Sequence, residues 1–239
     1  MIKPLDRQRE ERAKVLRMAQ RYFRQQLGLG LDPIYAPSAP KSFFPSNKEK
    51  INELYRQIKD CAKCSLHRTR THFVFGEGSP EAAVVFVGEA PGRDEDLQGR
   101  PFVGRAGQLL TKMLAAIHFN RQEVFIGNIL KCRPPNNRDP LPEEIQLCEP
   151  HLHAQLAIIE PNLICALGRI AAQTLLRTTE PLGRLRGDIH EYRGIGLIAT
   201  YHPAALLRNP GFKRGAWEDL KLLRREHDRL CKQRPAEIG

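Results

Sequence analysis

The sequence contains no hydrophobic segment that could cross a membrane and none that resembles a signal peptide. Its longest stretch without a charged side chain, residues 194–207, is shorter than the ~20 apolar residues of a transmembrane helix and is interrupted by His202 and Pro203. Residues 1–12 are rich in charge and lack the apolar core that precedes a cleavage site. We therefore do not expect a membrane-spanning or secreted protein, and these absences favour a cytoplasmic one.

Acidic residues are scarce relative to basic ones. The 239 residues include 38 Lys and Arg against 27 Asp and Glu, which gives a net charge of +11. A soluble protein with such an excess usually binds a polyanion, most often nucleic acid. A basic surface that serves only solubility is the alternative. The hydrophobic content of 41% and the charged content of 27% are ordinary for a folded protein, so general disorder is not expected.

The sequence shows no internal repeat, but its first part differs from the rest. Residues 5–27 predict an amphipathic helix that ends at Gly28, and the proline-rich stretch up to residue 46 is typical of a linker. We interpret residues 1–47 as an N-terminal appendage whose role the sequence does not disclose. Residues 48–239 are expected to form the functional domain.

Short apolar runs alternate with helical patterns in this second part. Buried strands are predicted at residues 83–87, 124–126, 163–167 and 197–200. Helices are predicted at residues 109–117, 145–159 and 215–231. Apolar strands separated by helices form a parallel sheet that is covered on both faces, so the fold class is α/β.

The unusual segments of the chain follow the predicted strands. Residues 88–92 (Gly-Glu-Ala-Pro-Gly) follow the first strand, Asn128 the second, and His202 the fourth. Ligands of such sheets bind at the carboxyl ends of the strands. Phe102 lies among glycines and arginines, which suits a ring that stacks on a base. Taken singly, each feature also fits a turn, a buried loop anchor or an isolated loop histidine.

Four of the six cysteines have a spacing that suits one metal centre. They are Cys61, Cys64, Cys132 and Cys148. In a reducing compartment grouped cysteines usually bind a metal, and here zinc and a [4Fe–4S] cluster are both compatible. The wide separation of the second pair favours the cluster, because zinc sites more often use two short pairs. Arg133 begins a rigid basic loop beside this centre, and we expect the metal to hold that loop against a phosphate backbone. We interpret Cys165 and Cys231 as structural or incidental.

In combination these segments resemble the uracil-DNA glycosylase superfamily, most closely its iron–sulfur-containing family 4. The resemblance extends from about residue 48 to residue 231 and is carried by residues 88–92, 101–107, 128–135 and 202–208. It implies a three-layer α/β/α sandwich with a central four-stranded parallel sheet. It also implies an enzyme that hydrolyses the N-glycosidic bond of deoxyuridine in DNA and carries a [4Fe–4S] cluster on the four cysteines.

The resemblance implies roles for the residues that would hold the base. Gly88 and Ala90 would line the uracil site, and Phe102 would stack on the ring. Asn128 would hydrogen-bond the pyrimidine edge and reject cytosine, whose donor–acceptor pattern is reversed. Glu95 would fill the space beside uracil C5, where the methyl group of thymine would clash.

Further roles concern the bond that breaks and the DNA around it. His202 would stabilise negative charge on uracil O2. Leu206 or Leu207 would fill the space that the base leaves in the duplex, and Arg208 would lie near phosphate.

Two departures bear on the mechanism. Better-known uracil-DNA glycosylases outside this family have an aspartate at the position of Ala90, where it orients the attacking water. Alanine cannot do so, and Glu89 is the nearest carboxylate. We therefore assign to Glu89 the role of orienting the water or of stabilising the sugar cation. A related branch traps uracil covalently through a histidine in a basic loop, but residues 134–138 contain no histidine. We therefore expect turnover.

The expected partner is uracil-containing DNA, single- or double-stranded, bound by a monomer. A non-catalytic nucleic-acid-binding module with a structural metal is the alternative. It explains the charge and the cysteines but not the polar residues at the strand ends. An iron–sulfur electron carrier is a third hypothesis, which predicts reversible reduction.

Overall fold

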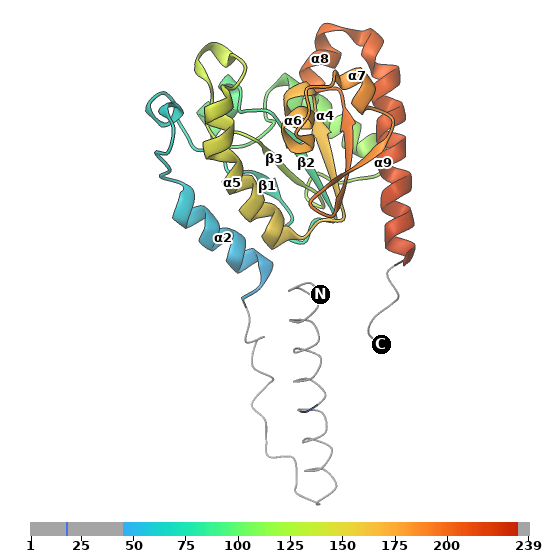
Figure 1. Cartoon of the computed structure of the whole chain (residues 1–239), viewed down its shortest axis with the longest axis horizontal. Coiled ribbons are helices and arrows are strands. Elements are labelled where there is room, and N and C mark those ends of the chain that lie inside the picture. The colour runs from blue at the N-terminus through green and yellow to red at the C-terminus, as the bar shows by residue number, and fades with distance from the viewer. Residues whose placement is uncertain (1–17, 19–44, 234–239) are drawn as a thin grey trace, which may run out of the picture. The chain divides into compact units, whose positions relative to one another are not determined.

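A mixed sheet of six strands lies at the centre of the part of the chain that the structure describes, namely Met18 and residues 45–233 (Figure 1). In this computed structural model the strand order is β1-β3-β2-β4-β6-β5. The chain divides into two units, residues 1–44 and 45–239, and the second contains the sheet. Apart from Met18, the predicted N-terminal helix lies outside the described residues, as does nearly all of the linker.

The central strands are parallel, as the sequence predicts. They are β3 (Phe125–Asn128), β2 (Val84–Gly88), β4 (Leu163–Leu167) and β6 (Ile195–Thr200). The sequence did not predict the antiparallel edge strands, β1 (Glu77–Gly78) and β5 (Ile189–Tyr192). β1 has two residues and β5 is buried mainly at its end, so neither forms the continuous apolar run of a central strand.

Helices connect the strands. They are α2 (Asn47–Ile58), α3 (Arg93–Gln98), α4 (Arg105–Ala116), α5 (Pro142–Ile159), α6 (Arg169–Leu176), α7 (Leu182–Leu185), α8 (Pro203–Arg208) and α9 (Lys213–Gln233). Short 3-10 turns lie at η1 (Ser65–Arg68), η2 (Pro135–Asn137) and η3 (Pro210–Phe212). Within residues 45–233, no helix is long and apolar enough to span a membrane.

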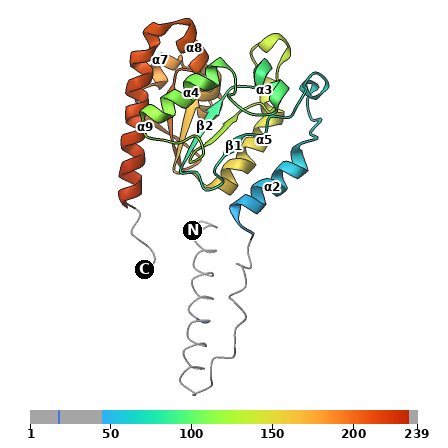
Figure 2. The ribbon, with the colours of Figure 1, turned by 180° about the vertical axis from the view of Figure 1, so that it is seen from behind.

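The sheet separates two hydrophobic cores, because successive strand residues point to opposite faces. Val85 and Val87 of β2 pack with residues of α5 and α6, whereas Val84 and Phe86 pack with residues of α4 and α9. The two views of the ribbon show α5 and α6 on one side of the sheet and α4, α8 and α9 on the other (Figures 1 and 2). The predicted three-layer α/β/α sandwich is thus confirmed.

The strand register brings the carboxyl ends of the central strands to the same level. Gly88 at the end of β2 pairs with Asn128 at the end of β3, and Leu167 of β4 pairs with Thr200 of β6. Asn128 is therefore the last residue of its strand, and His202 follows β6 by two positions. The edge formed by these ends carries the candidate site.

Candidate active site

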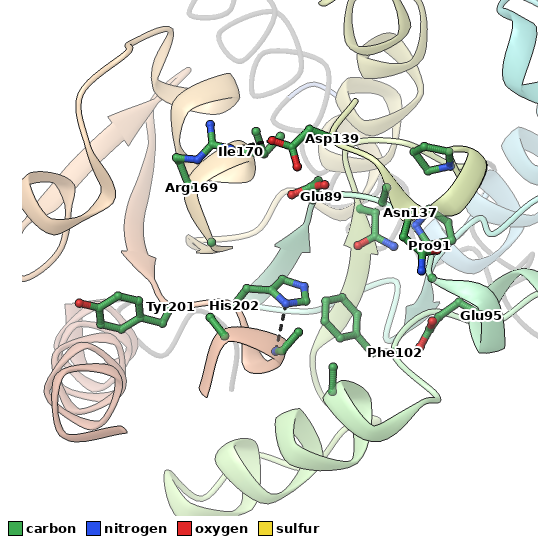
Figure 3. A pocket seen from close by; sticks show the side chains of 18 of the residues that line it. Glu89, Pro91, Glu95, Phe102, Asn137, Asp139, Arg169, Ile170, Tyr201 and His202 are labelled. Carbon is green, nitrogen blue, oxygen red and sulfur yellow. Dashed lines mark hydrogen bonds and ion pairs between the residues drawn. The ribbon is translucent and has the colours of Figure 1, made fainter. Parts of the chain in front are cut away.

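A cavity of about 620 Å³ opens at this edge. Its wall includes residues from every segment that the sequence singled out there: Glu89, Ala90, Glu95, Phe102, Asn128, His202 and Arg208 (Figure 3). The structure therefore brings together side chains more than one hundred positions apart in the sequence.

Asn128 provides an unpaired hydrogen-bond acceptor at the cavity. Its side chain is only 2% exposed, and Oδ1 has no hydrogen-bond partner in the described part of the chain. A Cβ atom on Gly88 would overlap Oδ1 and lie 2.7 Å from Cζ of Phe102, so glycine there leaves room for both side chains. A buried acceptor without a partner destabilises the fold by about 1–3 kcal/mol. A ligand that donates to Oδ1 would remove that penalty.

Phe102 forms one wall of the cavity from a constrained backbone position. Its φ of 51° lies in the left-handed region, which phenylalanine rarely adopts. A Cβ atom on Gly107 would overlap the carbonyl of Phe102, so the following helix needs glycine for this loop to fit. The Phe102 ring centroid is 5.5 Å from that of His202, with 32° between the planes. The ring is thus held beside the histidine.

Glu95 stabilises the loop that carries Phe102. Its Oε1 accepts hydrogen bonds from the backbone N–H groups of Val103 and Gly104, both at 2.9 Å. Gly104 is the N-cap of α4, where a carboxylate is favourable. Glu95 lines the cavity as expected. Because Oε1 is bound to the loop, Oε2 is the oxygen left for a ligand. Its role beside uracil C5 stays a prediction.

His202 caps α8, and this contact determines which ring nitrogen carries the proton. The backbone N–H of Ala204 donates to Nδ1 at 3.2 Å, so in the neutral ring the hydrogen is on Nε2. Burial, with a smaller contribution from the positive charge of Arg208, lowers the pKa of His202 to about 4. At neutral pH the side chain is therefore an uncharged donor through Nε2.

Glu89 is the carboxylate nearest to the β2 end of the cavity. Burial raises the pKa of Glu89 to about 6; Asp139 raises it further, and Arg169 opposes the shift. Arg169 Nη2 pairs with Asp139 Oδ2 at 2.7 Å on the same side of the cavity as Glu89 (Figure 3). Ala90 also lines the cavity and has no polar atom in its side chain. Glu89 thus has the environment of a group that exchanges a proton near neutrality.

Arg169, Asp139, Tyr201 and Phe212 line the cavity but were not predicted from the sequence. A signal for Arg169 was present, because it follows Gly168 at the end of β4, the one central strand end that we did not single out. Tyr201 lies between the end of β6 and His202, so it had the same local signal as the histidine, whereas the course of the loops that carry Asp139 and Phe212 is determined only by the fold.

The residues expected to contact DNA differ in burial. Leu206 is 2% exposed and belongs to the core beneath α8, whereas Leu207 is 41% exposed. Of the two leucines that the sequence offered for the space left by the base, Leu207 is thus the exposed one, and its role at the duplex stays a prediction. Arg208 is exposed and makes no ion pair within residues 45–233. Arg133 is half-buried and donates from Nε to Oδ1 of Asn137 at 2.7 Å, so it also braces its own loop.

The four expected ligand cysteines gather in one region, and all are free thiols. Burial raises the pKa of Cys148 to about 12, and nearby Cys132 and Cys64 add to the shift. Burial also raises the pKa of Cys132, with contributions from Cys64 and Cys61. Separate thiolates would repel one another in this space. A metal centre would remove that repulsion, so the donor set fits one.

Donor groups surround these sulfur atoms. Arg70 Nη1 donates to Cys132 Sγ at 3.1 Å, and the backbone N–H of Lys131 donates to Cys148 Sγ at 3.3 Å. His151 Nε2 lies 3.2 Å from Cys61 Sγ. Hydrogen bonds to cysteine sulfur are typical of iron–sulfur sites.

Among the described residues, no three His, Cys, Asp or Glu side chains form a group that could hold a metal ion. The preference for a [4Fe–4S] cluster over zinc therefore rests on the spacing of the cysteines along the sequence.

The comparisons with known proteins agree with this geometry. A family model described as "Uracil DNA glycosylase superfamily" matches residues 75–221. A type-4 uracil-DNA glycosylase of Archaeoglobus fulgidus is 49% identical over 181 residues, which cover 72% of this chain and 91% of the relative. In Pyrobaculum aerophilum a type-4 enzyme is 46% identical over 180 residues, covering 72% of this chain and 92% of the relative. A type-5 enzyme from the same organism is 31% identical over 195 residues, covering 67% and 85%.

Proposed function

The chain belongs to the uracil-DNA glycosylase superfamily, and we propose that it hydrolyses the N-glycosidic bond of deoxyuridine in DNA. The products are free uracil and an abasic site in the DNA. Their formation is the first step of base-excision repair. The substrate is uracil-containing DNA, and the acting species is a monomer. The single observation that carries this proposal is the orphaned Oδ1 of Asn128 between Phe102 and Gly88.

Asn128 supplies the base selectivity. Uracil presents an N3–H donor beside its O4 acceptor, which matches the amide Oδ1 and NH₂ of Asn128. Cytosine presents an acceptor at N3 and a donor at C4, so it would leave Oδ1 unpaired. A site built to bond a substrate N–H rejects an analogue without that group strongly, because buried polar groups then remain unsatisfied.

Phe102 and the DNA-facing residues offset the cost of extruding the base. A base inside a duplex cannot reach a cavity, so it must rotate out at a cost of a few kcal/mol. Stacking on an aromatic ring contributes about 1–3 kcal/mol. Leu207 is the exposed leucine of its pair and fills the vacated space, while Arg208 binds phosphate.

His202 and Glu89 act on the bond that breaks. The leaving uracil gains negative charge on O2, and Nε2–H of neutral His202 donates to that oxygen. One donor aimed at a developing anion contributes about 3–4 kcal/mol to catalysis. Ionised Glu89 lies on the side of the cavity that carries Asp139 and Arg169 (Figure 3), where its carboxylate orients the attacking water or stabilises the cationic sugar.

Cys61, Cys64, Cys132 and Cys148 hold a [4Fe–4S] cluster. When bound, the cluster supplies a structural cross-link between the segment after α2, the loop after β3 and α5. Arg70 joins the first two of these segments directly, since Nη1 donates to the carbonyl of Cys61 at 2.8 Å as well as to Cys132 Sγ. The loop that begins at Arg133 is thereby held at the cavity mouth.

Base release from single-stranded and duplex uracil oligonucleotides, followed by alkaline strand cleavage, tests the proposal. Asn128→Asp should lower uracil release about 100-fold and narrow the preference for uracil over cytosine, because a carboxylate cannot donate to O4. Asn128→Ala is the matched control that should lose uracil release without gaining cytosine release. DNA binding without release by the native protein would instead support the non-catalytic module.

A further inference from the structure

The cavity continues past His202 to an aromatic wall formed by Tyr201 and Phe212, with Leu182 also in the lining. Figure 3 shows Tyr201 on the opposite side of His202 from Phe102. At about 620 Å³ the whole cavity has room for more than the one pyrimidine ring that Phe102 and Asn128 enclose. The aromatic wall is therefore a part of the site to which the excision chemistry assigns no role.

Tyr201 and Phe212 form a stacked pair in this wall. Their ring centroids are 4.4 Å apart, and the planes are 5° from parallel. The guanidinium carbon of Arg186 lies 4.0 Å from the Tyr201 centroid. Since two groups at such distances cannot share one face of a ring, Arg186 and Phe212 lie on opposite faces of Tyr201. The three side chains thus form a column that ends at Phe212.

The buried end of this column is fixed by an ion pair. Arg186 Nε donates to Asp219 Oδ2 at 2.7 Å, and the Thr200 hydroxyl donates to the same oxygen at 2.6 Å. A Cβ atom on Gly215 would lie 2.5 Å from Arg186 Nη2, so glycine in α9 leaves room for the guanidinium. Glycine within a helix destabilises it relative to alanine. The fold therefore accepts a local cost to place Arg186 against Tyr201.

The other end of the column is open. Phe212 is 37% exposed and is the last residue of η3, the turn that links α8 to α9. Arg208, which also lines the cavity, is an exposed cation without an ion pair in residues 45–233. A fixed aromatic surface with a free cation beside it is the chemistry that binds a nucleotide, with the base on the ring and the phosphate on the cation.

We infer that Phe212 is a stacking platform for the base of the nucleotide next to uracil in the same DNA strand. This inference rests on the proposed function, because it extends the binding site along the strand that delivers the uracil. The platform binds any base, since every base has an aromatic face, and it contributes most on single-stranded DNA, where the neighbouring base has no partner.

The test uses single-stranded oligonucleotides whose central uracil has either adenine or a tetrahydrofuran abasic analogue on both sides. For the native protein, removing the flanking bases should lower kcat/KM roughly 5- to 150-fold, the range for one aromatic stack. Phe212→Ala should lower kcat/KM on the adenine-flanked substrate by a similar factor. For this variant, replacing the flanking adenines with the abasic analogue should change kcat/KM little further. Phe212→Trp keeps an aromatic face, so its kcat/KM should fall on removal of the flanking bases as it does for the native protein.

Two further variants separate stacking from folding. Phe212→Leu keeps an apolar contact with Tyr201 but has no aromatic face, so it should behave like Phe212→Ala at an unchanged melting temperature. Trp217→Ala is the matched control, since Trp217 is 41% exposed on α9 and does not line the cavity. It should keep the native response to flanking bases.

Two results would overturn the inference. One is a native protein with the same kcat/KM on both substrates, and the other is a Phe212→Ala variant whose kcat/KM falls on removal of the flanking bases as much as that of the native protein. Failure of the proposed function gives a different result, namely no uracil release from either substrate. In that case fluorescence anisotropy of the same oligonucleotides tests the platform alone. The native protein should then bind the adenine-flanked strand more tightly and Phe212→Leu should not; equal native binding of both strands would again overturn the inference.

Discussion

His202 and Glu89 face one cavity, and both must be deprotonated at neutral pH, which leaves the histidine uncharged and the glutamate negative. His202 must be neutral to donate through Nε2, and its pKa of about 4 keeps it neutral above that value. Glu89 must be ionised to orient water, and its pKa of about 6 means that the ionised fraction falls as pH drops through 6. Both shifts arise mainly from burial, which disfavours the charged form of each group.

Single-turnover uracil release by the native protein should therefore rise between about pH 5 and pH 7 and then level off. Glu89→Gln should be slower and should lose this rise, because the amide does not ionise. His202→Ala should be slower by about 100- to 1,000-fold but should keep the rise. A pH profile of single-turnover rates over pH 4.5–8.5 measures this. An unchanged rise in Glu89→Gln would show that another group titrates.

At the scale of elements, the segment from α3 to α4 behaves as one unit. Glu95 of α3 accepts from the backbone at the start of α4, and Phe102 lies between the two helices. Gly107 in the first turn of α4 allows the close approach of the Phe102 carbonyl. The stacking ring is therefore positioned by the hydrogen bonds of Glu95 and by the close approach at Gly107.

Glu95→Ala should remove the cap on α4 and lower the free energy of unfolding by about 1–2 kcal/mol. It should also raise KM for uracil DNA, because the Phe102 loop loses its anchor. Glu95→Gln keeps an acceptor oxygen and should retain most of the stability. Denaturant melts with steady-state kinetics measure both effects. If Glu95→Ala changes only the rate on thymine-containing DNA, the residue acts at C5 and not on the loop.

At the scale of the whole molecule, the cysteines join parts of the chain that are distant in sequence. Cys61→Ser should lower the iron bound per chain and the melting temperature together, because the proposed cluster would link the segment after α2 to α5. Cys231→Ser is the matched control, since Cys231 is exposed on α9. Iron analysis, visible absorbance and thermal melts of the purified proteins measure this. Full iron content in Cys61→Ser would remove Cys61 from the ligand set.

The central part of the fold and most of the site followed from local patterns. Apolar runs such as residues 163–167 are buried on both faces, so their composition alone predicts parallel strands. The edge strands lack that signal. Leu206 and Leu207 have the same side chain, and only the packing of α8 against the core that it shares with α4 distinguishes the buried one from the exposed one.

The sequence by itself determined the α/β class, the polar residues that end the strands and the cysteines suited to a metal, because each depends on spacing along the chain. The tertiary structure decided the rest. It left Asn128 Oδ1 without a hydrogen-bond partner among the described residues, fixed the proton of His202 on Nε2 and placed Phe212 against Tyr201. These properties arise from contacts and burial between distant segments, which no local pattern encodes.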